Sequence, residues 1–379
     1  MIFQERRPKV FICEPLAQHE YCHANADTQN LARGMASHAD VTLVSCAPFS
    51  DPLSGMECVK SSVADLNAKG EKHAPSRIRQ VLDAIATAIQ ASKQAIKDRP
   101  DLMIWPNGDA FSVLLASGLC GGVVSKLILH NAVLSPGVGT GWKFRLYWFF
   151  EKFFLRRIAK KGWLYTPSEE VRQEYERNHD IMIPADHVIP IGFRIRQLAE
   201  KRPFQSRILI FGAINNRKNY RCAIEAFLAQ TTFKELVLAG VLQDENIARL
   251  LEELDVAGRV RLLDRYIPEE ELADLFESAD FSLLPHGRGS SLASGTLSRA
   301  LEFGVPIIGP DEGYISEWLS KYEIGYSFNA DDPKSLVKIL IKCGEDYETF
   351  YKLFLKGYSK LSDDRSWKAV AKQFIKEFL

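Results

Sequence analysis

The sequence predicts an α/β protein of two domains, each built on a parallel sheet. Short apolar runs rich in β-branched residues alternate with helix-length amphipathic segments along the 379 residues. This alternation indicates βαβ units, because a strand returns parallel to its neighbour only through a crossover. Continuous apolar runs are typical of strands covered on both faces. The polar stretch Ile191–Ser206 interrupts the alternation, so we expect it to link the two domains, with a boundary near residue 198.

The apolar runs place the strands, and the amphipathic segments place the helices. The first half predicts strands at Val10–Cys13, Val41–Cys46, Leu102–Trp105, Lys126–His130 and Trp163–Thr166. The second half predicts strands at Arg207–Gly212, Glu235–Ala239, Arg259–Leu263, Phe281–Pro285, Val305–Ile308 and Gly325–Phe328. Predicted helices include Asn25–Ser37, Ser76–Lys97, Tyr220–Ala229, Pro268–Ser278 and Pro333–Lys342. Ligands of open α/β sheets bind at the carboxyl ends of strands, so functional residues are expected there.

One stretch approaches the length of a membrane span. Ala110–Leu129 carries almost no charge, but it contains several glycines and Lys126. We interpret it as a helix at Phe111–Ser117, a glycine turn and a buried strand at Lys126–Leu129, with a membrane span as the alternative.

Composition excludes some classes of protein. Lysine plus arginine and aspartate plus glutamate both number 48, so nothing global indicates a polyanion-binding protein and any anion site must be local. The seven cysteines form no CxxC pair, which argues against a zinc ribbon or a disulfide framework and favours reduced thiols in the cytosol. The polar segment Met1–Lys9 lacks the apolar core of a signal peptide.

Two strand-to-helix loops of the second half carry candidate anion-binding residues. The strand ending at Gly212 leads through Arg217 and Lys218 to Asn219, a good N-cap residue. Two cations beside a helix N-terminus suit a diphosphate, although basic residues in such loops are often solvated surface charges.

The second loop, Leu284–Leu297, is rich in glycine and serine and includes Arg288. Gly295 lets the backbone approach a ligand closely. The helix that follows carries Glu302, whose carboxylate can accept two hydroxyl hydrogen bonds, as a ribose offers. The alternative is a glutamate that faces solvent.

Together these stretches resemble the C-terminal domain of the family 4 glycosyltransferases, enzymes of GT-B fold that use nucleotide sugars. The resemblance covers about 150 residues and rests on Phe211–Gly212 with Arg217–Lys218, Ala226–Phe227, Leu236–Gly240, Arg259–Phe276, Ser278–Asp280, Leu284–Pro285 and Ala300–Ile308. The first half matches more loosely, through Leu127–His130, Tyr165–Val171 and Val188–Phe193.

The resemblance implies a fold and a separate binding role for each domain. Two Rossmann-like domains would face a central cleft, with residues 1–198 binding the acceptor and residues 199–362 binding the nucleotide sugar. Residues 363–379, which include the helix opened by Trp367, would cross back to pack on the first domain.

The resemblance also implies roles for the diphosphate-binding residues. Arg217 and Lys218 would clamp the diphosphate. The phosphate nearest the sugar would be held by the helix-start amides of Gly295, Thr296 and Leu297.

Other positions would bind the rest of the donor. Glu302 would bind the ribose, and the backbone at Tyr266–Ile267 would meet the base. His130 would contact the sugar and steady the charge that develops during transfer. A histidine with a purely structural role is the alternative.

Two features depart from the family pattern. The family has two glutamates eight positions apart, and the partner position of Glu302 is Ser294 here, which leaves the donor sugar open. A polysaccharide-associated subset of the family resembles this sequence in having a Ser-Gly pair. The usual glycine-rich loop after the first strand is replaced by Glu14–Asn25, whose histidines could contact acceptor or phosphate, or could be structural.

The implied reaction is transfer of a hexose from a UDP- or GDP-linked donor to a glycan or lipid-linked acceptor, with retained anomeric configuration, in polysaccharide or glycolipid synthesis. No cofactor or metal is expected, because no DxD-like motif follows a strand, and Asp331–Asp332 is interpreted as a helix N-cap. Two alternatives remain open: an enzyme similar to the nucleotide-sugar 2-epimerases, and a non-catalytic protein that binds sugar nucleotides. Nothing points to a nucleic-acid partner.

The segment Trp142–Lys161 combines eight aromatic residues with seven lysines and arginines and a single acid, Glu151. Such a helix suits an anionic membrane surface, so peripheral attachment to the inner face of the cytoplasmic membrane is one interpretation. A buried helix with cationic ends is the other.

Overall fold

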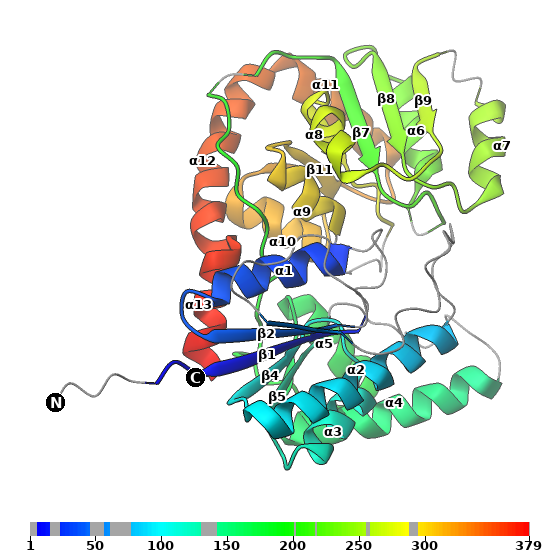
Figure 1. Cartoon of the computed structure of the whole chain (residues 1–379). Helices are drawn as coiled ribbons and strands as arrows, with labels where there is room; N and C mark the ends of the chain where they lie inside the picture. The colour runs from blue at the N-terminus through cyan, green and yellow to red at the C-terminus, as the bar shows by residue number, and fades with distance from the viewer. Residues whose placement is uncertain are drawn as a thin grey trace. The chain divides into compact units, whose positions relative to one another are not determined.

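The computed structural model describes residues 6–15, 23–45, 57–60, 77–129, 142–200, 202–216, 218–254, 258–287 and 295–378, leaving aside the side chains of 23–26, 57–60, 77–81 and 142–148. The chain divides into two compact units. One unit is Met1–Gly192 with Trp367–Leu379, and the other is Phe193–Ser366. Strands alternate with helices in both (Figure 1).

The first unit is built on a parallel sheet that has six strands among the described residues. The strands are β1 (Lys9–Glu14), β2 (Asp40–Ser45), β3 (Glu57–Lys60), β4 (Leu102–Trp105), β5 (Ser125–Ile128) and β6 (Leu164–Tyr165). Their order in the sheet is β3-β2-β1-β4-β5-β6. The helices are α1 (His23–Met35), α2 (Arg77–Asp98), α3 (Ala110–Leu119), α4 (Trp142–Lys160), α5 (Glu169–His179) and α13 (Trp367–Phe378).

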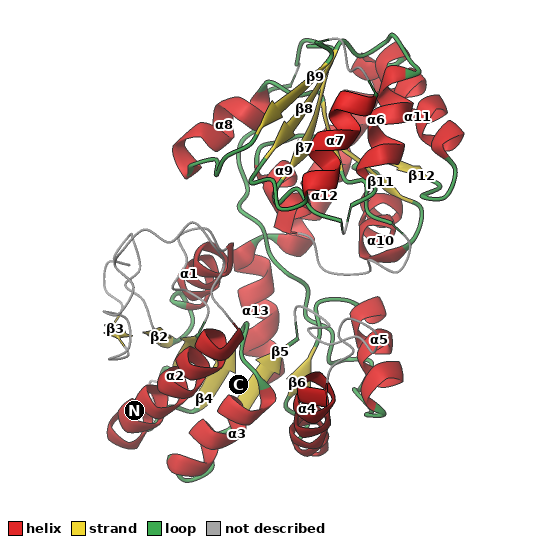
Figure 2. Ribbon diagram, turned by 90° about the vertical axis from the view of Figure 1, so that its right-hand side faces the viewer, coloured by secondary structure: helices red, strands yellow, loops and turns green. Residues whose placement is uncertain are grey.

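Both faces of this sheet are covered, which explains its continuous apolar strands. Along β1, Phe11 and Cys13 join a core with residues of α2, α3 and α4 on one face, while Val10 and Ile12 join a second core with α1 and α13. Helices accordingly flank both faces in Figure 2. Alternating side chains of one strand therefore serve two separate cores.

The C-terminal helix α13 belongs to the first unit, where it packs against α1. The two helices approach so closely at Gly34 that a Cβ there would lie 2.6 Å from the Trp367 carbonyl oxygen and 2.9 Å from the Ala371 Cβ. Figure 1 shows α13, in red, beside the blue α1. The expectation that the last helix returns to the first domain is confirmed.

The second unit repeats the architecture. Its strands, again among the described residues, are β7 (Arg207–Phe211), β8 (Glu235–Ala239), β9 (Val260–Leu263), β10 (Phe281–Leu283), β11 (Ile307–Pro310) and β12 (Gly325–Phe328), in the order β12-β11-β10-β7-β8-β9. The helices are α6 (Tyr220–Leu228), α7 (Glu245–Glu253), α8 (Glu269–Glu277), α9 (Gly295–Glu302), α10 (Gly313–Tyr322), α11 (Pro333–Glu345) and α12 (Tyr347–Arg365).

Both sheets have the strand order of doubly wound, Rossmann-like folds. The first strand of each unit lies between the second and the fourth, so the winding reverses between β1 and β4 and again between β7 and β10. Every recorded strand pairing is parallel. Ligands of such sheets bind at the carboxyl ends of the strands, at the point of reversal. In the second unit that point lies after Phe211 and Leu283.

The stretch that approached membrane-span length is a helix, a turn and a strand. Helix α3 ends at Leu119, Gly121 and Gly122 take positive φ angles of 81° and 89°, and β5 begins at Ser125. The interpretation made from the sequence is confirmed. Within the described part of the chain, no helix combines the length and the apolar composition that a membrane crossing requires.

Candidate functional site

In the second unit, glycines follow β7, which borders the point of reversal, and the adjacent strand β8. Gly212 follows β7 with a φ of +97°, a conformation that favours glycine. Gly240, which follows the adjacent β8, has a φ of +150°, and a Cβ there would lie 2.2 Å from the Gly212 carbonyl oxygen. At this edge the two strand ends therefore pack backbone against backbone, which a side chain at Gly240 would prevent.

Lys218 and Thr296 converge on the end of β7. The Lys218 Nζ donates a hydrogen bond to the Phe211 carbonyl oxygen at 2.8 Å, and the Thr296 hydroxyl donates to the same oxygen at 3.3 Å. A Cβ at Gly212 would lie 3.6 Å from the Lys218 Nζ and 3.2 Å from the Thr296 Oγ1. The structure thus brings three predicted residues together, and Asn219 caps α6 as predicted.

The Lys218 ammonium has no carboxylate partner among the described residues. Burial lowers its pKa from 10.5 to about 8, which is the expected effect of withdrawing a cation from water. It is a largely buried group and not a solvated surface charge. A bound anion would offset the cost of burying this cation.

His286 is a neighbour of Lys218 that the sequence analysis did not select. The two residues form an antiparallel bridge, and the Asn219 amide donates to the Pro285 carbonyl oxygen at 2.7 Å. Burial, with a further contribution from the Lys218 charge, lowers the pKa of His286 to about 4, so the imidazole is neutral near pH 7. Its Nδ1 is buried without a hydrogen-bond partner in the described part of the chain. The sequence feature that could have identified His286 is a polar residue placed directly after a strand.

Helix α9 begins beside this group. Gly295, Thr296 and Leu297 form its first turn, where backbone N–H groups lack partners within the helix. The Leu297 side chain is fully buried in the core, which fixes this helix end against the sheet. The first turn of α9 and the Lys218 ammonium together can bind an anion.

Glu302 lies at the other end of α9 and is buried. Its side chain is 4% exposed, and its Oε2 accepts a hydrogen bond from Arg299 at 2.9 Å. The guanidinium groups of Arg194 and Arg196 lie 3.5 and 3.8 Å from its Oε1. The alternative of a solvent-facing glutamate is therefore wrong. The ribose contact stays a prediction.

The residues predicted to meet the base differ in exposure. Tyr266 is 39% exposed, whereas Ile267 is 4% exposed and packs in the core. They lie between β9 and the first turn of α8, where Glu269 forms an ion pair with Arg299 of α9. This pair connects the predicted base site to the helix of the predicted phosphate site.

Four predicted site residues lie outside the described residues: His130, Arg217, Arg288 and Ser294. Among the residues that are described, no group of histidines, cysteines and carboxylates could hold a metal ion. Asp332 caps α11 by accepting a hydrogen bond from the Lys334 amide, as expected for Asp331–Asp332.

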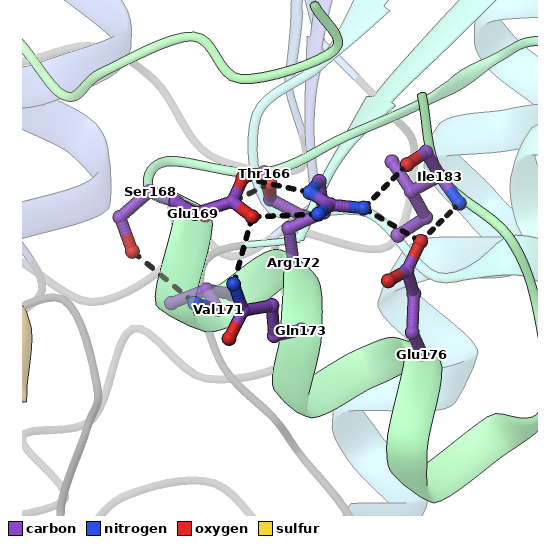
Figure 3. A network of polar contacts seen from close by, with 8 residues as sticks. All are labelled: Thr166, Ser168, Glu169, Val171, Arg172, Gln173, Glu176 and Ile183. Atoms are coloured by element: carbon purple, nitrogen blue, oxygen red, sulfur yellow. Dashed lines mark hydrogen bonds and ion pairs between the residues drawn. The ribbon is translucent and has the colours of Figure 1, made fainter. Parts of the chain in front are cut away.

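The strand-then-serine pattern of the first unit starts a helix. Ser168 caps α5, and its hydroxyl accepts a hydrogen bond from the Val171 amide at 3.2 Å (Figure 3). Arg172 lies between Glu169 and Glu176 and also donates to the Ile183 carbonyl oxygen. The hydrogen bonds from Arg172 lower the pKa of Glu169 to about 2. These contacts fix the start of α5.

Comparisons with known proteins extend this description. Residues 205–346, which run from β7 to the end of α11, match the model of the glycosyl transferases group 1. A search of curated proteins with this sequence found no match.

Solved structures match over nearly the whole chain. Sucrose-phosphate synthase from Thermosynechococcus elongatus superposes with a TM-score of 0.69 at 16% identity, covering 98% of each chain. A glycosyltransferase from Rickettsia africae gives 0.69 at 12% identity, covering 99% of this chain and 98% of the other. HepE from Anabaena, in complex with UDP-glucose, gives 0.68 at 13% identity, covering 98% and 99%. The chain therefore has the GT-B architecture of these structures, and its second unit carries a domain that matches the glycosyl transferases group 1.

Proposed function

We propose that the protein transfers a hexose from a UDP- or GDP-linked donor to a glycan or lipid-linked acceptor, with retained anomeric configuration, as a family 4 glycosyltransferase. The main observation that supports this proposal is the environment of the Lys218 ammonium. It is largely buried beside the first turn of α9 and has no carboxylate partner among the described residues. A diphosphate would complete this site. The binding of UDP-glucose by HepE, which has a similar fold, supports a nucleotide sugar.

The mechanism follows from where charge develops. The acceptor hydroxyl oxygen forms a bond to the anomeric carbon, and the bond from that carbon to the diphosphate oxygen breaks. The acceptor proton passes to the leaving phosphate. Lys218 and the α9 amides stabilise the leaving diphosphate more in the transition state than in the ground state. Neutral His286, next to Lys218, can donate one further hydrogen bond.

The remaining predicted residues complete the proposal. Arg217 and Arg288 would add positive charge to the diphosphate, and Ser294 would precede the α9 amides. His130 would face the sugar. Residues 1–198 are assigned to the acceptor and residues 199–362 to the donor. No divalent metal is assigned, because cationic side chains and helix-start amides would already offset the charge of the diphosphate.

A panel of UDP- and GDP-hexoses tests this function. We expect the purified protein to release nucleoside diphosphate from one donor in excess chelator, and faster when glycan or glycolipid acceptors are added. Nucleotide release that requires magnesium or manganese would contradict the metal-free assignment. Conversion of the donor to a 2-epimer would favour an epimerase, and donor binding without turnover would favour a non-catalytic protein.

We also propose that α4 attaches the protein to an anionic membrane surface at the cytosolic side. Three of its aromatic side chains are exposed, by 63% at Phe149, 49% at Phe150 and 43% at Phe153. The Arg157 guanidinium lies 4.4 Å from the centroid of the Phe153 ring, so cationic and aromatic groups share this surface. Burial raises the pKa of Glu151 to about 7, which reduces the negative charge that could repel an anionic surface.

Replacing Phe149, Phe150 and Phe153 by serine is expected to abolish sedimentation with vesicles that contain anionic lipid. Aromatic side chains insert at the interface, and each basic side chain near it contributes about 1 kcal/mol. Binding should also weaken as salt is raised. The matched control replaces three exposed apolar residues elsewhere, Met182, Ile341 and Leu353, by serine. Equal sedimentation of both variants would contradict attachment through α4.

A further inference from the structure

We propose that Asn107 binds a hydroxyl of the acceptor through its side-chain oxygen, and that Glu14 positions the Asn107 amide for this contact. The inference rests on the proposed function, which assigned the acceptor only to residues 1–198. It names the residue that would recognise one part of that acceptor and the chemical group that it would recognise.

Glu14 and Asn107 lie at the point of reversal of the first sheet. Glu14 is the last residue of β1, and Asn107 follows β4, which pairs with β1 (Figure 1). Ligands of doubly wound sheets bind at this point, outside the carboxyl ends of the strands. The two residues therefore occupy the position in the first unit where a ligand is expected.

A buried carboxylate orients the Asn107 amide. Glu14 is fully buried, and its Oε2 accepts hydrogen bonds from the Thr28 hydroxyl at 2.9 Å and from the Asn107 Nδ2 at 2.7 Å. A carboxylate oxygen is an acceptor, so the Asn107 group that faces it is the NH2. The amide oxygen of Asn107 is therefore turned away from Glu14.

The chain around Asn107 is fixed on both sides. A Cβ at Gly108 would lie 3.1 Å from the Trp105 Cβ, so the chain packs tightly where it leaves β4. Asp109 then caps α3 by accepting a hydrogen bond from the Ser112 amide. An amide that is held by packing and by a hydrogen bond can bind a ligand without first being ordered.

The amide oxygen of Asn107 suits a hydroxyl and not an anion. The side chain is partly exposed, and within the described part of the chain its Oδ1 accepts no hydrogen bond. An amide oxygen can only accept, so its ligand must donate. An ionised phosphate cannot donate, and the nearby Glu14 carboxylate would repel its charge. A sugar hydroxyl can donate, which assigns this position to the glycan part of the acceptor.

Deoxy acceptors test the contact. The probes are octyl β-D-glucopyranoside and its monodeoxy analogues, used with the UDP- or GDP-hexose that the wild type hydrolyses. Acceptor-dependent release of nucleoside diphosphate gives kcat/KM for the wild type, Asn107→Ala and Asn246→Ala. Asn246 is the matched control, because its amide also donates to a carboxylate, that of Asp244, but at an exposed position on α7.

In the wild type, one deoxy analogue is expected to lose about three- to tenfold in kcat/KM, which is the effect of losing one neutral hydrogen bond. Asn107→Ala should lose the same factor with octyl glucoside and nothing further with that analogue, whereas Asn246→Ala should behave like the wild type. A purely structural role of Asn107 would instead lower kcat/KM by one common factor for every acceptor, and that result would overturn the proposal.

Two changes at Glu14 test its positioning role. Glu14→Met removes the acceptor and lets the Asn107 amide rotate, so it should also lose the discrimination against that deoxy analogue. Glu14→Gln keeps an oxygen that can face Asn107 and should retain the discrimination. Full discrimination in a folded Glu14→Met would show that Glu14 does not position Asn107. If a thermal melt shows that Glu14→Met does not fold, Asn107→Ala decides alone, since Asn107 is partly exposed.

Failure of this inference is distinguishable from failure of the proposed function. Donor hydrolysis by the wild type without transfer to any octyl glycoside would overturn the assignment of Asn107 and leave the proposed function standing. Absence of donor hydrolysis by the wild type, with every UDP- and GDP-hexose of the panel, would overturn both.

Discussion

Lys218→Met is expected to weaken the binding of nucleoside diphosphate by about ten- to hundred-fold, without lowering the melting temperature. A charge-assisted hydrogen bond contributes about 1.5–3 kcal/mol, and here the lost partner would face a diphosphate. The nucleotide-free protein loses a largely buried cation that has no carboxylate partner among the described residues, and the Phe211 carbonyl oxygen to which Lys218 donates keeps its hydrogen bond from Thr296, so the stability should hold or rise. Calorimetry with UDP and GDP measures the affinity, and a thermal melt measures the stability.

The pH dependence of stability and of nucleotide affinity provides a second test with the same variant. The folded pKa of Lys218, about 8, lies below the ordinary 10.5. Between these values the unfolded chain binds more protons, so the stability of the nucleotide-free wild type should gain a contribution as pH rises from 8 to 10.5. A bound diphosphate raises the pKa again, so nucleotide affinity should fall as pH rises past 8. Both effects should be absent in Lys218→Met and present in Lys338→Met, which changes an exposed lysine of α11. If both variants bound nucleotide equally well, Lys218 would not be a ligand.

The fold could be predicted wherever burial marks the sequence. The strand β4 is apolar throughout, and β1 and β8 carry charge only at their ends, because helices cover both faces of their sheets, and such apolar runs are visible without a structure. The strand β3 was missed. Its sequence, Glu-Cys-Val-Lys, places charges at both ends, and it lies at the edge of its sheet, where a continuous apolar run is not required.

The site could be predicted only as far as local sequence determines it. Gly212 and Lys218 follow one strand closely, and Thr296 starts a helix after another, so the strand–loop–helix pattern was sufficient to select them. Glu302 is different, because the cations near its carboxylate include Arg194 and Arg196, about a hundred positions earlier in the chain. His286 was missed for a similar reason. Its proximity to Lys218 arises from strand pairing, and spacing along the chain does not show it.

Glu302→Gln is expected to destabilise the protein, and this separates a structural role from a ligand role. A carboxylate at the surface that serves only to bind ribose could be neutralised with a normal melting profile. A buried carboxylate that faces three guanidinium groups cannot, because its neutralisation weakens its charged hydrogen bond with Arg299 and its attraction to Arg194 and Arg196, at a cost of about 1.5–3 kcal/mol. For a unit of this size that corresponds to a loss of roughly 3–12 °C in melting temperature. Glu252→Gln, an exposed position on α7, is the control and should melt like the wild type.

The double variant Glu302→Gln, Arg196→Met tests whether the loss of stability comes from the arginine charges that Glu302 neutralises. Arg196 stacks on the Phe303 ring at 4.2 Å and contributes one of the charges that Glu302 neutralises. Arg196→Met keeps an apolar chain over that ring and removes the charge. In a Glu302→Gln background it should therefore restore part of the lost stability, so that the double variant is more stable than the sum of the single changes predicts. Additive losses would show that the two residues are not coupled. A normal melt of Glu302→Gln combined with weaker nucleotide binding would instead place the ribose at Glu302, since a carboxylate that can be neutralised without cost to the fold is available to a ligand.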